Sequence, residues 1–157
     1  MNKTTELRQG TAEWLDARRN LLTGSNFSAA MGVNRYKSRA ALWREYKNLV
    51  PSFTGNAATR WGQENEPHVI AGYEKARGCS VVRTGLHIHS SLDWMGCSPD
   101  GLIDGDGGIE IKCPYNHPFP HQAIPEYYMP QVQGFLEITQ REWCDYVCWT
   151  PNGTTCF

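Results

Sequence analysis

Three side chains that could carry out acid–base and metal chemistry lie in one segment of the chain. Asp100 follows Ser98 and Pro99, and Glu110 and Lys112 follow within the sequence Glu-Ile-Lys. Two carboxylates bind hard divalent cations through oxygen, and such cations activate water and neutralise charge at a phosphate. A neighbouring amine orients that water or stabilises the charge that develops. The segment therefore has the groups that metal-dependent hydrolysis of a phosphodiester requires.

The spacing of these residues places them on one side of a strand. Residues 108–113 read as a strand, in which successive side chains point to opposite faces. Glu110 and Lys112 then share one face, and the apolar residues between and beside them pack in the core. A loop rich in Gly and Asp leads from Asp100 into this strand and can bring Asp100 next to Glu110. The backbone carbonyl of Ile111 is a candidate for a further metal ligand.

A simpler interpretation is an exposed aspartate in a turn, followed by an ion pair between residues i and i+2 of a solvated strand. For the bare pattern D-x9-E-x-K this alternative is the more frequent one, because short patterns recur by chance. The Ser-Pro-Asp-Gly lead-in and the apolar residues around Glu-x-Lys favour a site.

Helix and strand signals indicate which elements position this segment. Helices are predicted after Thr11, at 26–31 behind Ser25 as N-cap, after Ser38, at 57–77 and at 127–138. Pro67 predicts a kink or a junction of two helices within 57–77. Strands are predicted at 80–83, 86–89, 93–97, 108–113 and 143–149. This order predicts an α/β domain with a mixed sheet.

Two of these helices have apolar faces that predict how they pack. The first has the face Trp14, Ala17, Leu21 and Leu22, and the third has the face Leu42, Tyr46 and Leu49.

Chain length and the distribution of charge limit the number of domains and the kinds of ligand. The 157 residues fit a single domain, 1–157. The net charge of −1 does not by itself indicate a nucleic-acid-binding protein. Residues 1–77, however, hold 12 Lys+Arg against 7 Asp+Glu, whereas residues 78–157 hold 3 against 9. Such a division fits a phosphate-binding face beside a metal-binding pocket, or chance.

The sequence also predicts where the protein works. No apolar run is long enough to cross a bilayer, and the first ten residues lack the apolar centre of a signal peptide. The six cysteines show neither a disulfide framework nor the spacing of a zinc site. We therefore expect a cytoplasmic protein with reduced thiols and no membrane partner, in the host cytoplasm if a phage encodes it.

Short motifs occur in a fixed order over nearly the whole chain. They are Trp14-x3-Arg18, Leu22-Thr23-Gly24-Ser25, Trp61-Gly62-x3-Glu66, Cys97-Ser98-Pro99-Asp100-Gly101-Leu102, Glu110-Ile111-Lys112-Cys113-Pro114 and Tyr128-Met129-Pro130-Gln131-Val132-Gln133. Together they resemble the lambda-exonuclease-like, or YqaJ-like, viral recombinases of the PD-(D/E)XK nuclease superfamily. The resemblance implies a restriction-endonuclease-like core, with a mixed central β-sheet flanked by α-helices.

The resemblance also implies roles for individual residues. The catalytic set comprises Asp100, Glu110, Lys112, Glu66 and Gln131. Within it, Asp100, Glu110 and Glu66 bind metal, and Gln131 supports the site. The Ile111 carbonyl is the candidate for a further metal ligand. A second set matches positions that bind a 5′-terminal phosphate and comprises Arg18, Ser25 and Ser98. Without the resemblance, Arg18 reads as a surface cation, Ser25 as an N-cap, and Glu66 as a solvated acid.

The function that follows is a metal-dependent 5′-to-3′ double-stranded DNA exonuclease, which resects ends before strand annealing in phage-type recombination. The cofactor expected is Mg²⁺, with Mn²⁺ as a substitute, in two ions. Expected partners are double-stranded DNA ends, a single-strand annealing protein and, by the resemblance, further copies in a homotrimer. The alternatives are a single-strand nuclease or endonuclease on the same fold, or a non-catalytic module that binds DNA ends.

Overall fold

A five-stranded mixed sheet carries the Glu110 segment in its middle strand. The computed structural model describes residues 3–5, 7, 9–51 and 53–157. The strands follow the order β3-β6-β7-β8-β9, with bounds β3 Val81–Val82, β6 Gly101–Ile103, β7 Gly107–Lys112, β8 Trp143–Thr150 and β9 Gly153–Cys156. Strand β7 pairs antiparallel with β6 and parallel with β8. Glu110 thus lies on a strand with a partner on each side.

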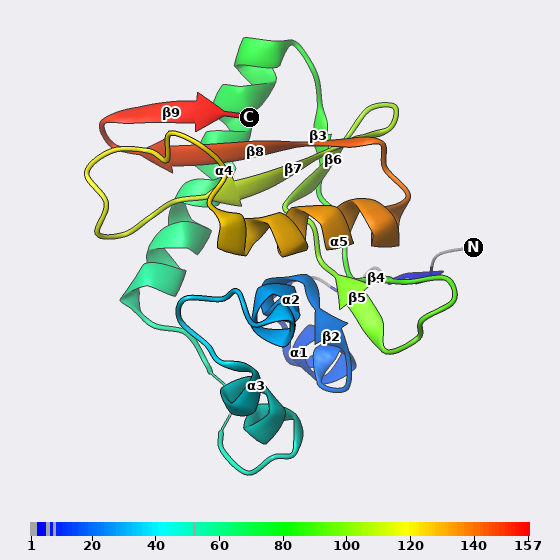
Figure 1. Cartoon of the computed structure of the whole chain (residues 1–157). Coiled ribbons are helices and arrows are strands. Elements are labelled where there is room, and N and C mark those ends of the chain that lie inside the picture. The colour runs from blue at the N-terminus through cyan, green and yellow to red at the C-terminus, as the bar shows by residue number, and fades with distance from the viewer. Residues whose placement is uncertain (1–2, 6, 8, 52) are drawn as a thin grey trace.

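Two helices cover the two faces of this sheet. Helix α4, Ala57–Arg77, packs Val69 and Ile70 against Ile109 and Ile111 of β7. Helix α5, Met129–Thr139, lies on the opposite face, where its Phe135 meets the backbone of β7 (Figure 1). The isoleucines of β7 therefore face α4, while Glu110 and Lys112 face α5. The arrangement confirms the predicted α/β fold and the alternation predicted for this strand.

A second, smaller sheet carries the N-terminal motifs. Its order is β1-β4-β5-β2, with bounds β1 Lys3–Thr4, β2 Leu22–Thr23, β4 His87–Ile88 and β5 Met95–Cys97. The remaining helices are α1 Ala12–Arg18, α2 Gly24–Met31, α3 Arg39–Tyr46 and the 3₁₀ helix η1 Glu126–Tyr128. Helix α5 lies between the larger sheet and α2 (Figure 1), and Phe27 of α2 packs with Phe135 and Ile138.

Local signals account for most helix ends. Thr11 caps α1 by accepting from the N–H of Trp14, and Ser38 caps α3 by accepting from that of Ala41. Gly78 ends α4 in the left-handed conformation that glycine adopts readily. Of the helices in the described part of the chain, none is both long and apolar enough to span a membrane.

Several details differ from the sequence prediction. Ser25 does not cap a helix: α2 begins at Gly24, so Ser25 lies in its first turn. Residues 57–77 form one helix that runs through Pro67, so of the two predicted effects of Pro67, a kink or a junction of two helices, the junction is excluded. Helix α1 ends at Arg18, and Leu22 belongs to β2 instead. Leu49 lies beyond α3 and is 62% exposed, so it is not part of that helix's apolar face.

The strands that were missed are short or close to glycine-rich turns. Strands β1, β2, β6 and β9 were not predicted; β6 lies within the segment that was read as a loop. Each has two to four residues, too few for alternation to be recognised. Their pairing comes from neighbouring strands that the local sequence does not specify.

Gly108→Ala is expected to lower the free energy of unfolding by about 1–3 kcal/mol. The added Cβ would lie 2.1 Å from Cζ of the buried Phe135 ring, which occupies that space. Urea denaturation measures the effect. Gly72→Ala in α4 is the control, because no heavy atom lies within 4 Å of its added Cβ, and it is expected to keep or raise stability. Equal stabilities of the two variants would contradict this packing.

Candidate active site and phosphate pocket

A buried carboxylate, an amine and an amide form a hydrogen-bonded cluster on the α5 side of β7. The Nζ of Lys112 and the Nε2 of Gln131 both donate to Oε1 of Glu110. The same Nζ donates to Oε1 of Gln131 at 3.2 Å. The side chain of Glu110 is only 4% exposed and that of Lys112 is 19% exposed. Strand β7 therefore supplies the acid and the amine, and the first turn of α5 supplies the amide that holds both.

Asp100 joins this cluster from the turn between β5 and β6. Its Oδ2 accepts a hydrogen bond from the backbone N–H of Ile111 at 2.7 Å. The carboxylate is thereby fixed beside the strand, next to Glu110, as the glycine-rich loop predicted. The side chain of Ile111 is buried in the core on the other face.

The electrostatics of the cluster show an excess of buried negative charge. Burial and the neighbouring Glu110 raise the pKa of Asp100 from 3.8 to about 7, against the opposing effects of Lys112 and the Ile111 N–H. Burial lowers the pKa of Lys112, but Glu110 and then Asp100 outweigh it, so that the pKa is raised and the amine stays protonated. Since one buried amine does not fully compensate two carboxylates, the cluster favours a further cation.

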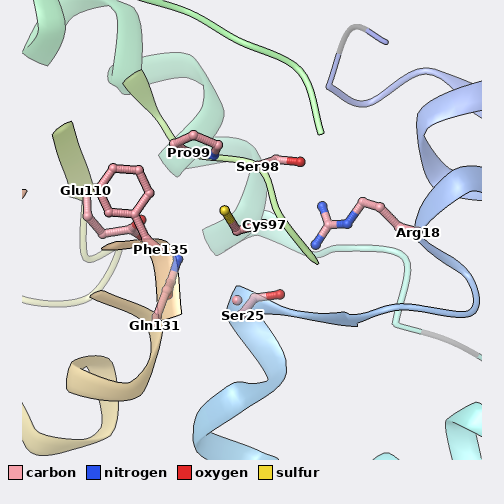
Figure 2. A pocket seen from close by; sticks show the side chains of 9 residues that line it. Arg18, Ser25, Cys97, Ser98, Pro99, Glu110, Gln131 and Phe135 are labelled. Carbon is pink, nitrogen blue, oxygen red and sulfur yellow. Dashed lines mark hydrogen bonds between the residues drawn. The ribbon is translucent and has the colours of Figure 1, made fainter. Parts of the chain in front are cut away.

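A pocket of about 140 Å³ adjoins the cluster. Glu110 and Gln131 form part of its wall, and the remaining lining comes from Arg18, Gly24, Ser25, Cys97, Ser98, Pro99 and Phe135. At about 30 Å³ per water molecule, it holds a small anion but not a base pair. Figure 2 shows Arg18 directed toward the side where Ser25 and Ser98 lie, with Glu110 and Gln131 beyond Cys97.

The cationic wall of this pocket depends on Trp14. The guanidinium of Arg18 stacks on the Trp14 ring, 3.9 Å from its centroid, and the Trp14 Nε1 donates to Oγ of Ser98 at 3.0 Å. Burial lowers the pKa of Arg18, which remains a cation at neutral pH. Within the described part of the chain, Arg18 has no carboxylate within ion-pair distance. A partly desolvated cation of this kind attracts an anion.

Two neutral groups complete the pocket. Burial raises the pKa of Cys97 to about 12, so its thiol carries no charge that would repel an anion. Ser25 is exposed in the first turn of α2, where backbone N–H groups lack partners inside the helix. Its Oγ lies 3.5 Å from that of Thr23.

The structure thus brings together most, but not all, of the residues predicted for the site. Asp100, Glu110, Lys112 and Gln131 form one cluster, and Arg18, Ser25 and Ser98 share the adjoining pocket. Glu66 neither lines the pocket nor shares a hydrogen bond with the cluster; it forms an ion pair with Arg83, whose charge also favours the ionised form of Asp100. Among the described residues, no three His, Cys, Asp or Glu side chains converge as a preformed metal-ligand set.

Two contributions were missed at the level of sequence. Tyr128 lies beside Lys112, with Nζ 4.7 Å from the ring centroid, and the sequence predicts no role for it. Trp14 was expected only as an apolar helix residue, whereas it binds both Arg18 and Ser98. Its Nε1 was the one available signal, because a buried indole N–H usually has a partner.

Two solved structures that share this architecture are exonucleases. The chain matches the crystal structure of an alkaline exonuclease from Laribacter hongkongensis with a TM-score of 0.76 and 31% sequence identity, covering 94% of this chain and 80% of that one. A phage-related exonuclease from Haemophilus somnus has a TM-score of 0.56 at 17% identity, with coverage of 82% and 68%. The second likeness shows the fold alone. These matches support the restriction-endonuclease-like fold.

Residues 13–142 match the YqaJ-like viral recombinase domain, and the chain belongs to this family. It is 30% identical over 138 residues to the uncharacterized protein YqaJ of Bacillus subtilis, covering 83% of this chain and 43% of that protein. It is 25% identical over 164 residues to an uncharacterized protein of Acanthamoeba polyphaga mimivirus, covering 94% and 30%. The chain thus spans less than half the length of these relatives.

With a chelator present, the wild type is expected to lose stability relative to Asp100→Asn as the pH rises from about 4 to about 7. A carboxyl whose folded pKa lies above its unfolded value favours the folded state when protonated, and this contribution is lost as it ionises. Urea denaturation at several pH values measures the difference. Asp104→Asn, an exposed aspartate in the β6–β7 turn, controls for the loss of one acidic charge. A difference that does not change with pH would contradict a buried, strained Asp100 carboxylate.

Proposed function

We propose that this protein is a metal-dependent exonuclease that degrades one strand of double-stranded DNA from its 5′ end. The observation that carries the proposal is the pocket lined by Arg18, Ser25 and Ser98, which suits an anion. Glu110 lines the same pocket and also belongs to the acid–amine cluster. A phosphate bound in this pocket would lie next to the groups that phosphodiester hydrolysis requires. The alkaline exonuclease of Laribacter hongkongensis is also known in complex with dAMP, and a mononucleotide is the size of product that such an enzyme releases.

The residues present fit a divalent cation. Asp100 and Glu110 are oxygen donors, which Mg²⁺ prefers, and burial together with the charge of Glu110 raises the pKa of Asp100, which a bound cation would offset. We propose that they hold Mg²⁺, with Mn²⁺ as a substitute and two ions in all, together with the Ile111 carbonyl and Glu66. A bound divalent cation supplies a more acidic water and neutralises charge on the phosphate.

The chain's own groups then have distinct tasks. Lys112 stays protonated and can stabilise charge that develops at the scissile phosphate. Gln131 donates to Glu110 and accepts from Lys112, so it keeps the acid and the amine in one geometry. Arg18, steadied by its stack on Trp14, holds the terminal phosphate and thereby sets which bond lies at the catalytic cluster.

The proposal extends to the biological role. Membership of the YqaJ-like viral recombinase family supports end resection before strand annealing in phage-type recombination. On this proposal the partners are double-stranded DNA ends, a single-strand annealing protein and further copies of the chain in a homotrimer. A single-strand nuclease or an endonuclease would use the same cluster but would need no pocket for a terminal phosphate, which is why the Arg18 pocket favours an exonuclease.

Lys112→Ala is expected to lower the rate of magnesium-dependent cleavage by about 10²–10³-fold, because it removes a charge placed beside the reacting phosphate. Cation and DNA binding should persist, since Asp100, Glu110 and Arg18 remain. Digestion of end-labelled duplex with Mg²⁺, Mn²⁺ or chelator measures the first effect, and calorimetry the second. Lys75→Ala, an exposed lysine of α4, is the control. Normal cleavage by Lys112→Ala would show that this lysine has no catalytic role.

Arg18→Gln is expected to abolish discrimination between 5′-phosphorylated and 5′-hydroxyl duplexes. The wild type should favour the phosphorylated end by about 10–100-fold in kcat/KM, the equivalent of one charge-assisted hydrogen bond. Parallel digestion of both substrates measures the ratio. Arg19→Gln, whose native side chain is exposed and pairs with Asp16 at 3.5 Å, should retain the preference. Equal wild-type rates on the two ends would refute the pocket and favour an endonuclease.

A further inference from the structure

Arg83 lies at the edge of the cluster formed by Asp100, Glu110, Lys112 and Gln131. It is the first residue after β3, which pairs antiparallel with β6 so that Val82 lies opposite Leu102. One further step along this register places Arg83 opposite Gly101, the residue directly after Asp100. The strand pairing therefore brings Arg83 beside the turn that carries Asp100.

The guanidinium of Arg83 acts on two of the carboxylates proposed to bind metal. It forms an ion pair with Oε1 of Glu66, whose side chain is 20% exposed, while its own is 58% exposed. Its charge also favours the ionised form of Asp100. A divalent cation bound by Glu66 and Asp100 would take over the same negative charge. Arg83 and that cation are therefore competitors for Glu66.

Among the basic residues of the second half of the chain, Arg83 is the one that DNA can reach. Residues 78–157 contain Arg83, Lys112 and Arg141 as their basic residues. Lys112 is held in the catalytic cluster, and NH1 of Arg141 donates to the carbonyls of Ile103 and Gly105. Arg83 alone of these three has a largely exposed side chain, and its planar fork suits a phosphate better than a point charge does.

We propose that Arg83 neutralises the Glu66 carboxylate until a divalent cation binds there. The cation then releases the guanidinium, and Arg83 binds a backbone phosphate of the DNA. This inference rests on the proposed function, because it takes Glu66 as a metal ligand and DNA as the substrate. The exchange couples cation binding to DNA binding, since each cation that takes Glu66 frees one guanidinium. No covalent step is involved.

The first test measures cation affinity without DNA. Arg83→Ala is expected to tighten Mn²⁺ binding by about three- to tenfold in calorimetric titration, because the competing positive charge is gone. Arg83→Gln, which keeps much of the side chain's length but no charge, should behave in the same way. Arg77→Ala is the matched control: Arg77 pairs with Asp145 at 3.0 Å, and its side chain is 55% exposed. Unchanged or weaker Mn²⁺ binding by both Arg83 variants would overturn the proposal.

The second test follows DNA binding as salt is varied. For a 5′-phosphorylated duplex in Ca²⁺, the slope of log K against log salt should be shallower by about 0.9 for Arg83→Gln than for the wild type, the loss of one phosphate contact. With chelator the two slopes should be equal, because Glu66 then holds the guanidinium. Equal slopes in Ca²⁺, or the same difference in chelator, would each contradict metal-dependent release.

Two comparisons distinguish a failure of the Arg83 proposal from a failure of the proposed function. If the wild type neither binds Mn²⁺ nor cleaves duplex DNA with Mg²⁺, the proposed function fails. If it does both, and the Arg83 variants match it in Mn²⁺ affinity and salt dependence, the role of Arg83 alone fails. Thermal unfolding with chelator verifies that each variant is folded before either comparison is made.

Discussion

The carboxylate of Glu110 is buried in the middle strand of the larger sheet, and much of the surrounding structure compensates its charge. A carboxylate in this position is costly unless it is paired and hydrogen-bonded. The strand itself supplies Lys112, and helix α5 supplies Gln131. Because the sheet fixes one partner and a helix packed upon it fixes the other, the geometry of the cluster depends on how α5 sits on β7.

The position of α5 is in turn set by two glycines that leave room for two aromatic rings. Gly108 leaves room for the Phe135 ring, and Gly134 leaves room for that of Phe27 in α2. Helix α5 is thus packed between the larger sheet and the N-terminal part of the chain (Figure 1). The pocket beside the acid–amine cluster lies at this junction, with Glu110 and Gln131 on one side and Arg18 and Ser25 on the other.

Much of this could be predicted from sequence because it depends on local rules. The face shared by Glu110 and Lys112 follows from strand alternation, and the ends of α4 follow from its cap and from Gly78. The joint role of Arg18, Ser25 and Ser98 was predicted only through the resemblance to a family; the structure places the three at one pocket, and their role stays a prediction. No local rule brings Arg18 and Ser98 together, because the residues between them form three helices, α2, α3 and α4, and strands of both sheets.

Other features could not be predicted because tertiary contacts decide them. The pairing of β6 with β3 has no signal in three residues of sequence, yet it places Arg83 beside Asp100. Ser25 was predicted to be the N-cap, but the preceding Leu22–Thr23 strand pairs with β5, and α2 begins two residues earlier than predicted, at Gly24. Trp14 reads as an ordinary core residue until Ser98 is placed next to its indole nitrogen.

The contacts of the Trp14 indole show which part of the chain forms which part of the site. Through it, the first helix holds one wall of the anion pocket, whereas the acids and the amine belong to the larger sheet and its turn. The reactive groups and the feature that would recognise a strand terminus therefore reside in separate pieces of the chain. On the proposed function, changes in the N-terminal helix would alter which strand terminus is recognised and would leave the acid–amine cluster intact.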